Sequence, residues 1–125
     1  MSGRHEDICR KKAQIIVHNT AQWDIYQEAA NRAYLERAKE FPNTRRMVAE
    51  HIPGFEFKFG SNLEDTPKFI DGEIVRDDYY IIKNGLIIAQ YVDFRGSYKT
   101  IGYTQSMSCI GLYPELYSGE PVFKQ

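Results

Sequence analysis

The residues best suited to chemistry lie between Asp93 and Tyr103. Arg95 and Lys99 are cations, and Tyr98 and Tyr103 carry hydroxyls on rigid rings, so the segment combines directional hydrogen bonds with surface that can be buried. Such residues are enriched at recognition surfaces, and on a concave sheet they could also clamp a nucleotide. We therefore predict a ligand- or partner-binding surface, and its candidate residues are Tyr79, Tyr91, Asp93, Arg95, Tyr98, Lys99 and Tyr103.

A structural interpretation of the same residues is the simpler one. It places Tyr91 and Tyr103 in the core and makes Arg95 a turn residue that pairs with Asp93. Exposure of the two tyrosines would separate the two interpretations, because core residues lose their contact with water.

Acidic side chains form a second candidate group. Most of the acids between Glu64 and Glu73 lie in a polar segment, where solvation is expected. Asp77 and Asp78 instead adjoin an apolar strand and should point to opposite faces, so one of them must face an apolar layer or a pocket. If the protein is an enzyme, we expect Asp78 as general base, with Tyr91 and Tyr103 orienting the substrate.

Histidine and cysteine give a weak signal for metal binding. His5 and Cys9 could share a helix face, whereas His18 and His51 have no His or Cys at zinc-ligand spacing. We therefore expect no metal and no cofactor. Cys9 and Cys109 lie far apart in the sequence, so we expect two isolated thiols and a reducing, cytoplasmic setting.

Composition and motifs exclude several classes of function. The chain has no P-loop, Rossmann glycine pattern, HExxH, EF-hand loop, paired CxxC or GxSxG. The net charge of −1 argues against nucleic acid as the partner. Hydrophobic residues at 42% are typical of a globular protein, and no apolar run has the length of a membrane span or a signal-peptide core.

The first half of the chain predicts helices. We expect one from Arg4 to His18, with Asn19 and Thr20 breaking the chain and capping the next helix, or else a continuous helix through Asn19. The second helix should run from Ala21 to Phe41, because apolar residues recur there at three- and four-residue spacing. Its buried stripe is Trp23, Tyr26, Ala30, Ala33, Tyr34, Ala38 and Phe41. A short third helix is expected at Arg45–Ile52.

The second half predicts a sheet, since 13 of the 17 aromatic residues follow Gly54. Phe55–Gly60 alternates apolar and charged residues, as an edge strand does. Asn84-Gly85 predicts a two-residue type I′ turn that pairs Ile82 with Ile87 and Ile81 with Ile88. We expect a loop at Ser61–Glu73, a turn at Arg95–Ser97, a strand at Tyr98–Thr104, and a packed irregular tail at Cys109–Phe123.

These elements predict an α+β fold: two or three N-terminal helices packed on an antiparallel meander of about four strands. The chain should form a single domain, with residues 1–54 helical and residues 55–125 forming the sheet. Both hairpin faces are apolar, so the helices can cover only one of them. The other must meet the tail, a pocket or a second subunit.

Three function classes fit this architecture. The first is a small cytoplasmic binding or inhibitor-type protein, such as phages encode, that forms a homodimer through a sheet face and holds a protein partner or small ligand. The second is a pocket enzyme, because helices followed by a wrapping sheet are similar in arrangement to cone-shaped NTF2-like domains. The third is a small RNA-binding protein or metal-independent ribonuclease that uses Arg95, Lys99 and a histidine. We favour the first class, because no catalytic motif is present.

Overall fold

The chain folds into two sheets with helices packed against them. The structure is a computed structural model, and it describes residues 2–38, 52–60, 68–71 and 74–124. In chain order the main elements are α1 (Ser2–Lys12), β1 (Gln14–Val17), α2 (Thr20–Ala38), β2 (Glu56–Phe59), β3 (Lys68–Asp71), β4 (Ile74–Arg76), β5 (Tyr79–Lys83), β6 (Leu86–Val92), β7 (Phe94–Thr100), β8 (Tyr103–Ser108), α4 (Cys109–Leu112), the 3-10 helix η2 (Pro114–Tyr117) and β9 (Val122–Phe123).

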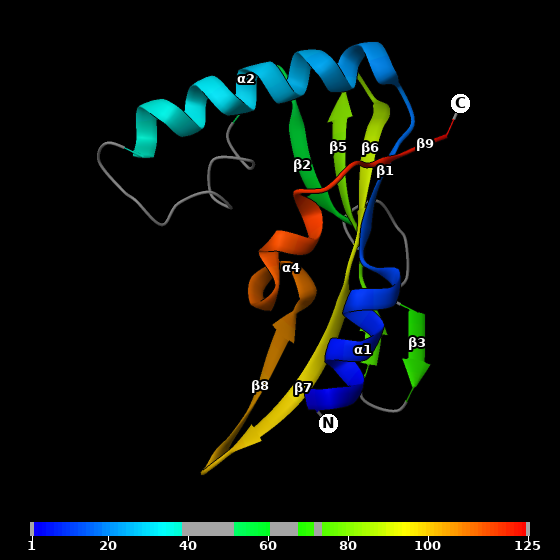
Figure 1. Cartoon of the computed structure of the whole chain (residues 1–125), viewed down its shortest axis with the longest axis vertical. Coiled ribbons are helices and arrows are strands. Elements are labelled where there is room, and N and C mark those ends of the chain that lie inside the picture. The colour runs from blue at the N-terminus through cyan, green and yellow to red at the C-terminus, as the bar shows by residue number, and fades with distance from the viewer. Residues whose placement is uncertain (1, 39–51, 61–67, 72–73, 125) are drawn as a thin grey trace.

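One long ribbon joins the two sheets. A five-stranded sheet has the order β2-β5-β6-β1-β9, and a four-stranded sheet has the order β3-β4-β7-β8. Only Asp93 separates β6 from β7, so this ribbon runs from the first sheet into the second (Figure 1). The predicted α+β class is confirmed. The sheets are larger than the expected meander because Gln14–Val17, Lys68–Asp71 and Phe94–Thr100 form additional strands.

The predicted first helix is wrong in its second half. Helix α1 ends at Lys12, and Gln14–Val17 instead forms β1, which pairs with β6 in the register Ile15↔Tyr91 and Val17↔Ala89. Three consecutive β-branched residues favour this outcome, because Ile and Val pack well on a pleated surface and lose side-chain freedom in a helix. Pairing with β6 then overrides the helical pattern that precedes them.

Helix α2 covers the five-stranded sheet much as predicted. Asn19 caps it: its side-chain oxygen accepts from the Gln22 amide at 3.1 Å, so the alternative of a continuous helix is wrong. Trp23 and Tyr26 are each 2% exposed and stack at 5.6 Å, in one core with Ile15, Val17, Ile81, Ile88 and Ala89. Figure 1 shows α2 lying across the upper ends of β2, β5 and β6. The predicted end of this helix at Phe41 and the third helix at residues 45–51 lie outside the described residues.

The central hairpin has the predicted turn, but its strand register agrees with the prediction only near that turn. Asn84 and Gly85 have φ of 51° and 79°, as a type I′ turn requires, and Lys83↔Leu86 and Ile82↔Ile87 pair as predicted. Beyond them Ile88 forms a bulge, so Ile81 pairs with Ala89 rather than with Ile88. The bulge puts both Ile88 and Ala89 into the core under α2, with exposures of 1% and 0%.

A second hairpin replaces the turn expected at Arg95–Ser97. Strand β7 runs straight through these residues, and the chain reverses instead at Ile101-Gly102, where Gly102 has φ of 89°. Gly96 had suggested a turn, but it lies within the β7–β8 pairing, opposite Met107. The predicted strand at Tyr98–Thr104 is therefore the end of β7, the turn and the start of β8. Figure 1 shows this hairpin extending away from α2, with α1 beside β7.

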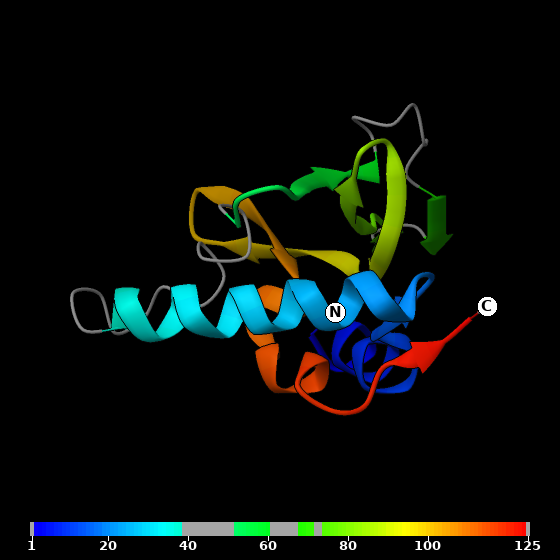
Figure 2. The same cartoon turned by 90° about the horizontal axis from the view of Figure 1, so that it is seen from above.

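Two other expectations concern the edge of the five-stranded sheet and the C-terminal tail. Strand β2 lies at an edge of its sheet, as the alternation of Phe55–Gly60 predicted. The tail was expected to be irregular, but it carries the helix α4, the 3-10 helix η2 and the short strand β9, which pairs in parallel with β1. Seen from above, α1 and α4 lie on the same side of the molecule, opposite β2 and β3 (Figure 2). Within the ranges described, no helix is long and apolar enough to cross a membrane.

The expectation of two isolated thiols is wrong. Cys9 of α1 and Cys109 at the start of α4 form a disulfide across a sequence separation of 100 residues. Tertiary packing brings the two elements together, because Cys9, Ile74, Val92, Phe94 and Cys109 form a second core. The argument for a reducing compartment from unpaired cysteines therefore no longer stands.

The disulfide should contribute strongly to stability. Closing so long a loop restricts the unfolded chain, and such bonds commonly contribute about 2–5 kcal/mol. We predict that reduction lowers the free energy of unfolding by this amount, measured by chemical denaturation with and without reductant. The C9S/C109S variant should match the reduced wild type and ignore reductant; a wild type indifferent to reductant would contradict the prediction.

Candidate functional site

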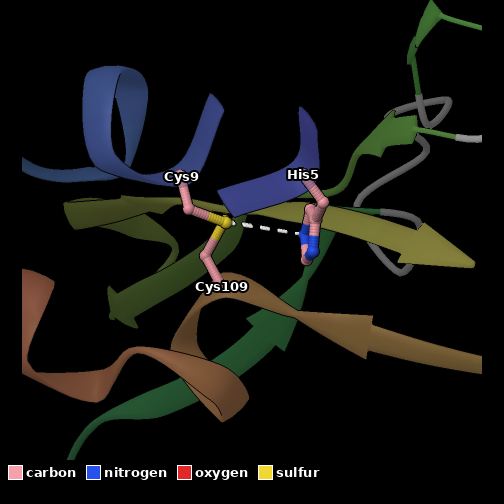
Figure 3. Close-up of side chains that lie close together, drawn as sticks. All are labelled: His5, Cys9 and Cys109. Atoms are coloured by element: carbon pink, nitrogen blue, oxygen red, sulfur yellow. Dashed lines mark hydrogen bonds between the residues drawn. A yellow bond between two sulfur atoms is a disulfide. The ribbon is translucent and has the colours of Figure 1, made fainter. Parts of the chain in front are cut away.

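A buried histidine lies against the disulfide. Helical spacing puts His5 and Cys9 one turn apart on the same face of α1, and both are 0% exposed. The His5 Nε2 atom lies 3.5 Å from Cys9 Sγ and 4.0 Å from Cys109 Sγ (Figure 3). The three donor atoms all fall within 4.8 Å of one another. A ring nitrogen and two sulfurs are thus gathered at the root of the β7–β8 hairpin.

Two hydrogen bonds define the orientation of the His5 ring. Nε2 lies 2.7 Å from the Phe94 carbonyl oxygen, and Nδ1 lies 2.7 Å from the Tyr98 hydroxyl. A carbonyl only accepts, so Nε2 carries the hydrogen and donates it. In the neutral ring Nδ1 must then accept from Tyr98. Burial raises the pKa of Tyr98, which keeps its hydroxyl protonated for this bond.

Gly96 provides the space that His5 occupies. A Cβ built on Gly96 would lie 2.8 Å from His5 Cγ, closer than real Cβ contacts come. This glycine is needed for close approach of helix and strand rather than for a turn. The imidazole, the disulfide and β7 are therefore packed as one unit.

Asp93 holds the Cys109 side of this unit. Its Oδ1 accepts from the backbone amides of Phe94 at 2.9 Å, Cys109 at 2.8 Å and Ile110 at 3.3 Å. The Tyr117 hydroxyl adds a longer contact at 3.4 Å. The side chain is only 2% exposed, and burial raises the pKa of Asp93 to about 6 despite these donors. The carboxyl group ties the bend in the long ribbon to the beginning of α4.

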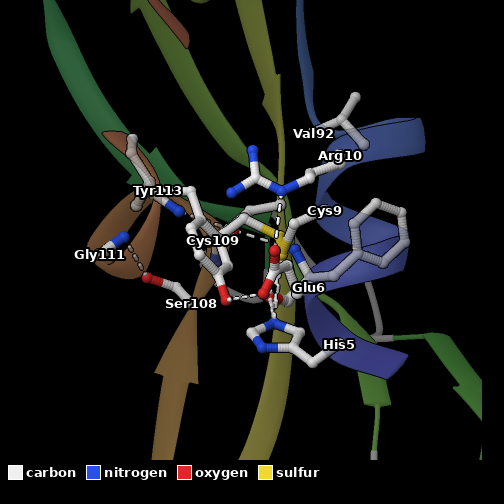
Figure 4. The surroundings of a disulfide bond; sticks show 12 residues. His5, Glu6, Cys9, Arg10, Val92, Ser108, Cys109, Gly111 and Tyr113 are labelled. Carbon is white, nitrogen blue, oxygen red and sulfur yellow. Dashed lines mark hydrogen bonds and ion pairs between the residues drawn. A yellow bond between two sulfur atoms is a disulfide. The ribbon is translucent and has the colours of Figure 1, made fainter. Parts of the chain in front are cut away.

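An exposed ion pair closes the outer side of the disulfide. Arg10 Nε donates to Glu6 at 2.9 Å, the Tyr113 hydroxyl donates to the same carboxylate at 3.4 Å, and the Arg10 guanidinium lies 5.1 Å from the Tyr113 ring centroid. Figure 4 shows these side chains around the bond. The charges are about half exposed, so the pair contributes little to stability.

A separate series of hydrogen bonds runs from Arg76 of β4 to His18, which follows β1. Arg76 forms a two-pronged ion pair with Asp78, with Nε to Oδ1 at 3.1 Å and Nη2 to Oδ2 at 2.9 Å. Gln90 donates to the same Oδ2 at 2.6 Å and lies 3.1 Å, through Oε1, from His18 Nε2. Hydrogen bonding to Asp78 raises the pKa of Arg76. Both oxygens of Asp78 are therefore engaged by donors from the protein.

The candidate catalytic residues lie apart. Tyr91 packs under α2 against Trp23 with ring centroids 6.4 Å apart, and burial raises its pKa to about 12. Gln90, the partner of Asp78, alternates with Tyr91 and faces the other side of the sheet. Tyr103 is 64% exposed near the hairpin turn. The structure thus does not bring Asp78, Tyr91 and Tyr103 together.

The predicted recognition residues divide into two groups. Tyr79 and Tyr91 pair directly across β5 and β6 and belong to the sheet interior, and Asp93 lies at the bend. Arg95, Tyr98, Lys99 and Tyr103 lie on the β7–β8 hairpin. By register Tyr98 and Tyr103 share one face of this hairpin, while Arg95 lies on the other. Arg95 pairs loosely with Asp77, at 3.9 Å, rather than with Asp93.

Sequence reasoning missed the site formed by His5, Cys9 and Cys109. The spacing of His5 and Cys9 was a usable signal, because residues four apart on a helix face the same way. Nothing comparable marks Cys109, since its position follows from the register of β8 against β7.

Comparisons with known proteins leave the function to be argued from this geometry. Protein-family models, curated proteins and solved structures were all compared with the chain, and none of them matches.

The contact between Gly96 and His5 gives a direct test of the packing. G96A should lower the free energy of unfolding by about 1–3 kcal/mol, because the added methyl overpacks the site. G119A adds a methyl where nothing lies within 4 Å and is the matched control. In the H5A/G96A double variant the loss should be smaller than the sum of the single losses. Additive losses, measured by urea denaturation, would mean that the methyl meets some other group.

The raised pKa of Asp93 predicts an unusual pH dependence of stability. The folded protein holds this proton up to about pH 6, whereas the unfolded chain releases it near the ordinary value of 3.8. The contribution of Asp93 to the free energy of unfolding should therefore be fully present below about pH 4. It should fall by at most about 3 kcal/mol as the pH rises to 6.

The D93N variant isolates this effect. Asparagine keeps an oxygen acceptor for the three amides but carries no charge, so the difference in unfolding free energy between variant and wild type should grow from pH 4 to pH 7. Subtracting the two curves removes the contribution of all other titrating groups. A constant difference would show that Asp93 does not titrate in this range.

Proposed function

We propose that this chain is a small cytoplasmic binding protein of the inhibitor type, which self-associates and holds a protein partner through its β7–β8 hairpin. The observation that carries the proposal is the open edge of β8. This strand ends the four-stranded sheet in the described part of the chain, and all residues from Ile101 to Ser106 are exposed. A sheet edge of this kind accepts another strand through main-chain hydrogen bonds.

The side chains of this hairpin suit a polypeptide partner. Strand β8, Tyr-Thr-Gln-Ser-Met-Ser, contains no charge and no proline, the two features that commonly block edge pairing. Ile101 at the turn is 100% exposed, and Tyr103 adds a largely exposed ring. Apolar and aromatic groups beside an open edge favour a protein strand over a charged polymer such as RNA.

The root of the hairpin supports the same interpretation. The disulfide, the His5 ring and the Asp93 carboxyl group all hold the base of β7 and β8. A hairpin fixed at its base loses little conformational freedom on binding, and this raises affinity without additional contacts. The location in the cytoplasm is part of the proposal. A single disulfide in 125 residues is far from the dense frameworks of small secreted domains.

The two other function classes have less support. As a general base Asp78 would need a lone pair directed at substrate, but donors from Arg76 and Gln90 engage both of its oxygens. Ribonuclease chemistry would need a histidine beside Arg95 and Lys99, whereas His5 lies against Tyr98, on the face of β7 opposite Arg95.

The partner tested first at the β8 edge is a second copy of the chain. Light scattering over a micromolar concentration series should show a dimer for the wild type. In S106K the new charge lies on the edge, so we expect the dimer dissociation constant to rise at least about tenfold. Q27K places the same charge on the exposed side of α2 and should leave dimerisation unchanged.

Two results would count against the proposal. A wild type that is strictly monomeric would remove self-association, and a dimer equally stable in S106K and I101D would place the contact away from this hairpin. Circular dichroism of each variant verifies that the fold is retained.

A further inference from the structure

The cluster of His5, Cys9 and Cys109 has a chemical use beyond holding the hairpin. Two sulfurs and an imidazole nitrogen are the donor set that zinc prefers in proteins. All three residues are 0% exposed, and they come from two elements far apart in the sequence. Their donor atoms already lie within 4.8 Å of one another.

The nitrogen–sulfur distances are close to those of a zinc site. With Zn–S near 2.3 Å and Zn–N near 2.0–2.1 Å, tetrahedral geometry separates a sulfur and a nitrogen ligand by about 3.5 Å. His5 Nε2 lies at this distance, 3.5 Å, from Cys9 Sγ and at 4.0 Å from Cys109 Sγ. To bind the ion, the two bonded sulfurs would have to separate, and Cys109 Sγ would have to move closer to Nε2.

Neighbouring groups can complete such a site. The Phe94 carbonyl oxygen lies 2.7 Å from His5 Nε2 and 3.4 Å from Cys109 Sγ, so a fourth oxygen donor is adjacent. The Tyr98 hydroxyl lies 2.7 Å from Nδ1 and can accept as well as donate. When Nε2 binds a metal, the hydrogen moves to Nδ1 and is donated to Tyr98. Bonds of this kind orient metal-binding histidines.

We propose that the reduced protein binds a thiophilic divalent cation, Zn²⁺, through His5, Cys9 and Cys109, and that disulfide and metal are alternative states of one site. A dithiol reductant supplies two electrons and two protons, which cleave the Cys9–Cys109 bond to two thiols while the reductant becomes a disulfide. Zn²⁺ then replaces the two thiol protons, which pass to solvent. Oxidation of the two thiolates by a disulfide oxidant re-forms the bond and expels the ion.

Charge balance favours a divalent ion. Two buried thiolates without a counter-ion would carry two negative charges away from water, which is costly. One Zn²⁺ makes the site neutral, whereas Cu⁺ would leave one charge uncompensated. Both the disulfide and the zinc-bound state hold α1 against the base of the hairpin, so a reducing cytoplasm would not release it.

Cobalt is the probe for this site. The full chain is reduced, freed of reductant without oxygen, and titrated with Co²⁺. The expected result is one ion per chain, with thiolate-to-cobalt charge transfer and the visible bands of tetrahedral Co²⁺. Zn²⁺ should displace the cobalt, whereas Cu⁺ preference would overturn the divalent assignment. The oxidised chain has the same sequence and should show neither signal.

Variants assign the ligands. H5Q should abolish the tetrahedral bands or shift them strongly. Y98F should weaken Co²⁺ binding about 10- to 100-fold, because the bond to Nδ1 is lost. Q27K changes an exposed residue of α2 and should leave Co²⁺ binding unchanged. Since variants can also lose the fold, the thermal midpoint is followed with Zn²⁺: it should rise for the reduced wild type and stay constant for the oxidised one.

Two outcomes would overturn the inference. One is the same cobalt spectrum in the oxidised and reduced wild type, or none in either. The other is a tetrahedral spectrum that H5Q leaves unchanged, because His5 would then not be a ligand. Both are independent of the dimer experiment, so this inference and the proposed binding function can fail separately.

Discussion

The structure depends on one long-range constraint, the junction of α1 with the end of β8. The Cys9–Cys109 bond closes a loop of 100 residues, and the two cysteines belong to a core with Phe94 and Val92. With α1 fixed there, His5 fills the space above Gly96, and its ring bonds to β7 through Phe94 and Tyr98. Covalent, steric and hydrogen-bonding restraints thus act on the same few residues.

Two buried carboxylates extend this constraint along the ribbon that joins the sheets. Asp93 anchors the amides at the start of α4, and Asp78 accepts from Arg76, Gln90 and, at 3.4 Å, the Asp93 amide. The two acids meet the bend from opposite sides. Buried carboxyl groups are costly unless they are satisfied, and both of these collect several donors. Their hydrogen bonds hold the bend where β6 passes into β7.

The ribbon that joins the two sheets differs in burial along its length. The same ribbon is buried in β6, where α2 covers it, and exposed at Ile101 and Tyr103. Rigidity at the base and exposure at the end are separate properties, and both are needed to present an edge strand to a partner. The β7–β8 hairpin therefore combines an exposed edge strand with a base that the disulfide holds.

The local features of the fold could be predicted from the sequence. Trp23 and Tyr26 recur at helical spacing and form the core under α2, Asn84-Gly85 forms the predicted turn, and Phe55–Gly60 yields an edge strand. Each of these features depends on neighbours a few residues away, so periodicity and turn chemistry were sufficient to predict it. The α+β class follows from these elements. Tyr98 was predicted to lie on a recognition surface, whereas its hydroxyl lies 2.7 Å from His5 Nδ1.

The remaining features could not be predicted from the sequence, because they depend on pairing between distant segments. β1 exists because Ile15 and Val17 find β6, and the bulge at Ile88 exists because two residues are drawn into the core under α2. Gly96 had the local signature of a turn but serves the approach of His5. The bond between Cys9 and Cys109 had no local signature, since their meeting requires the whole chain between them to be folded.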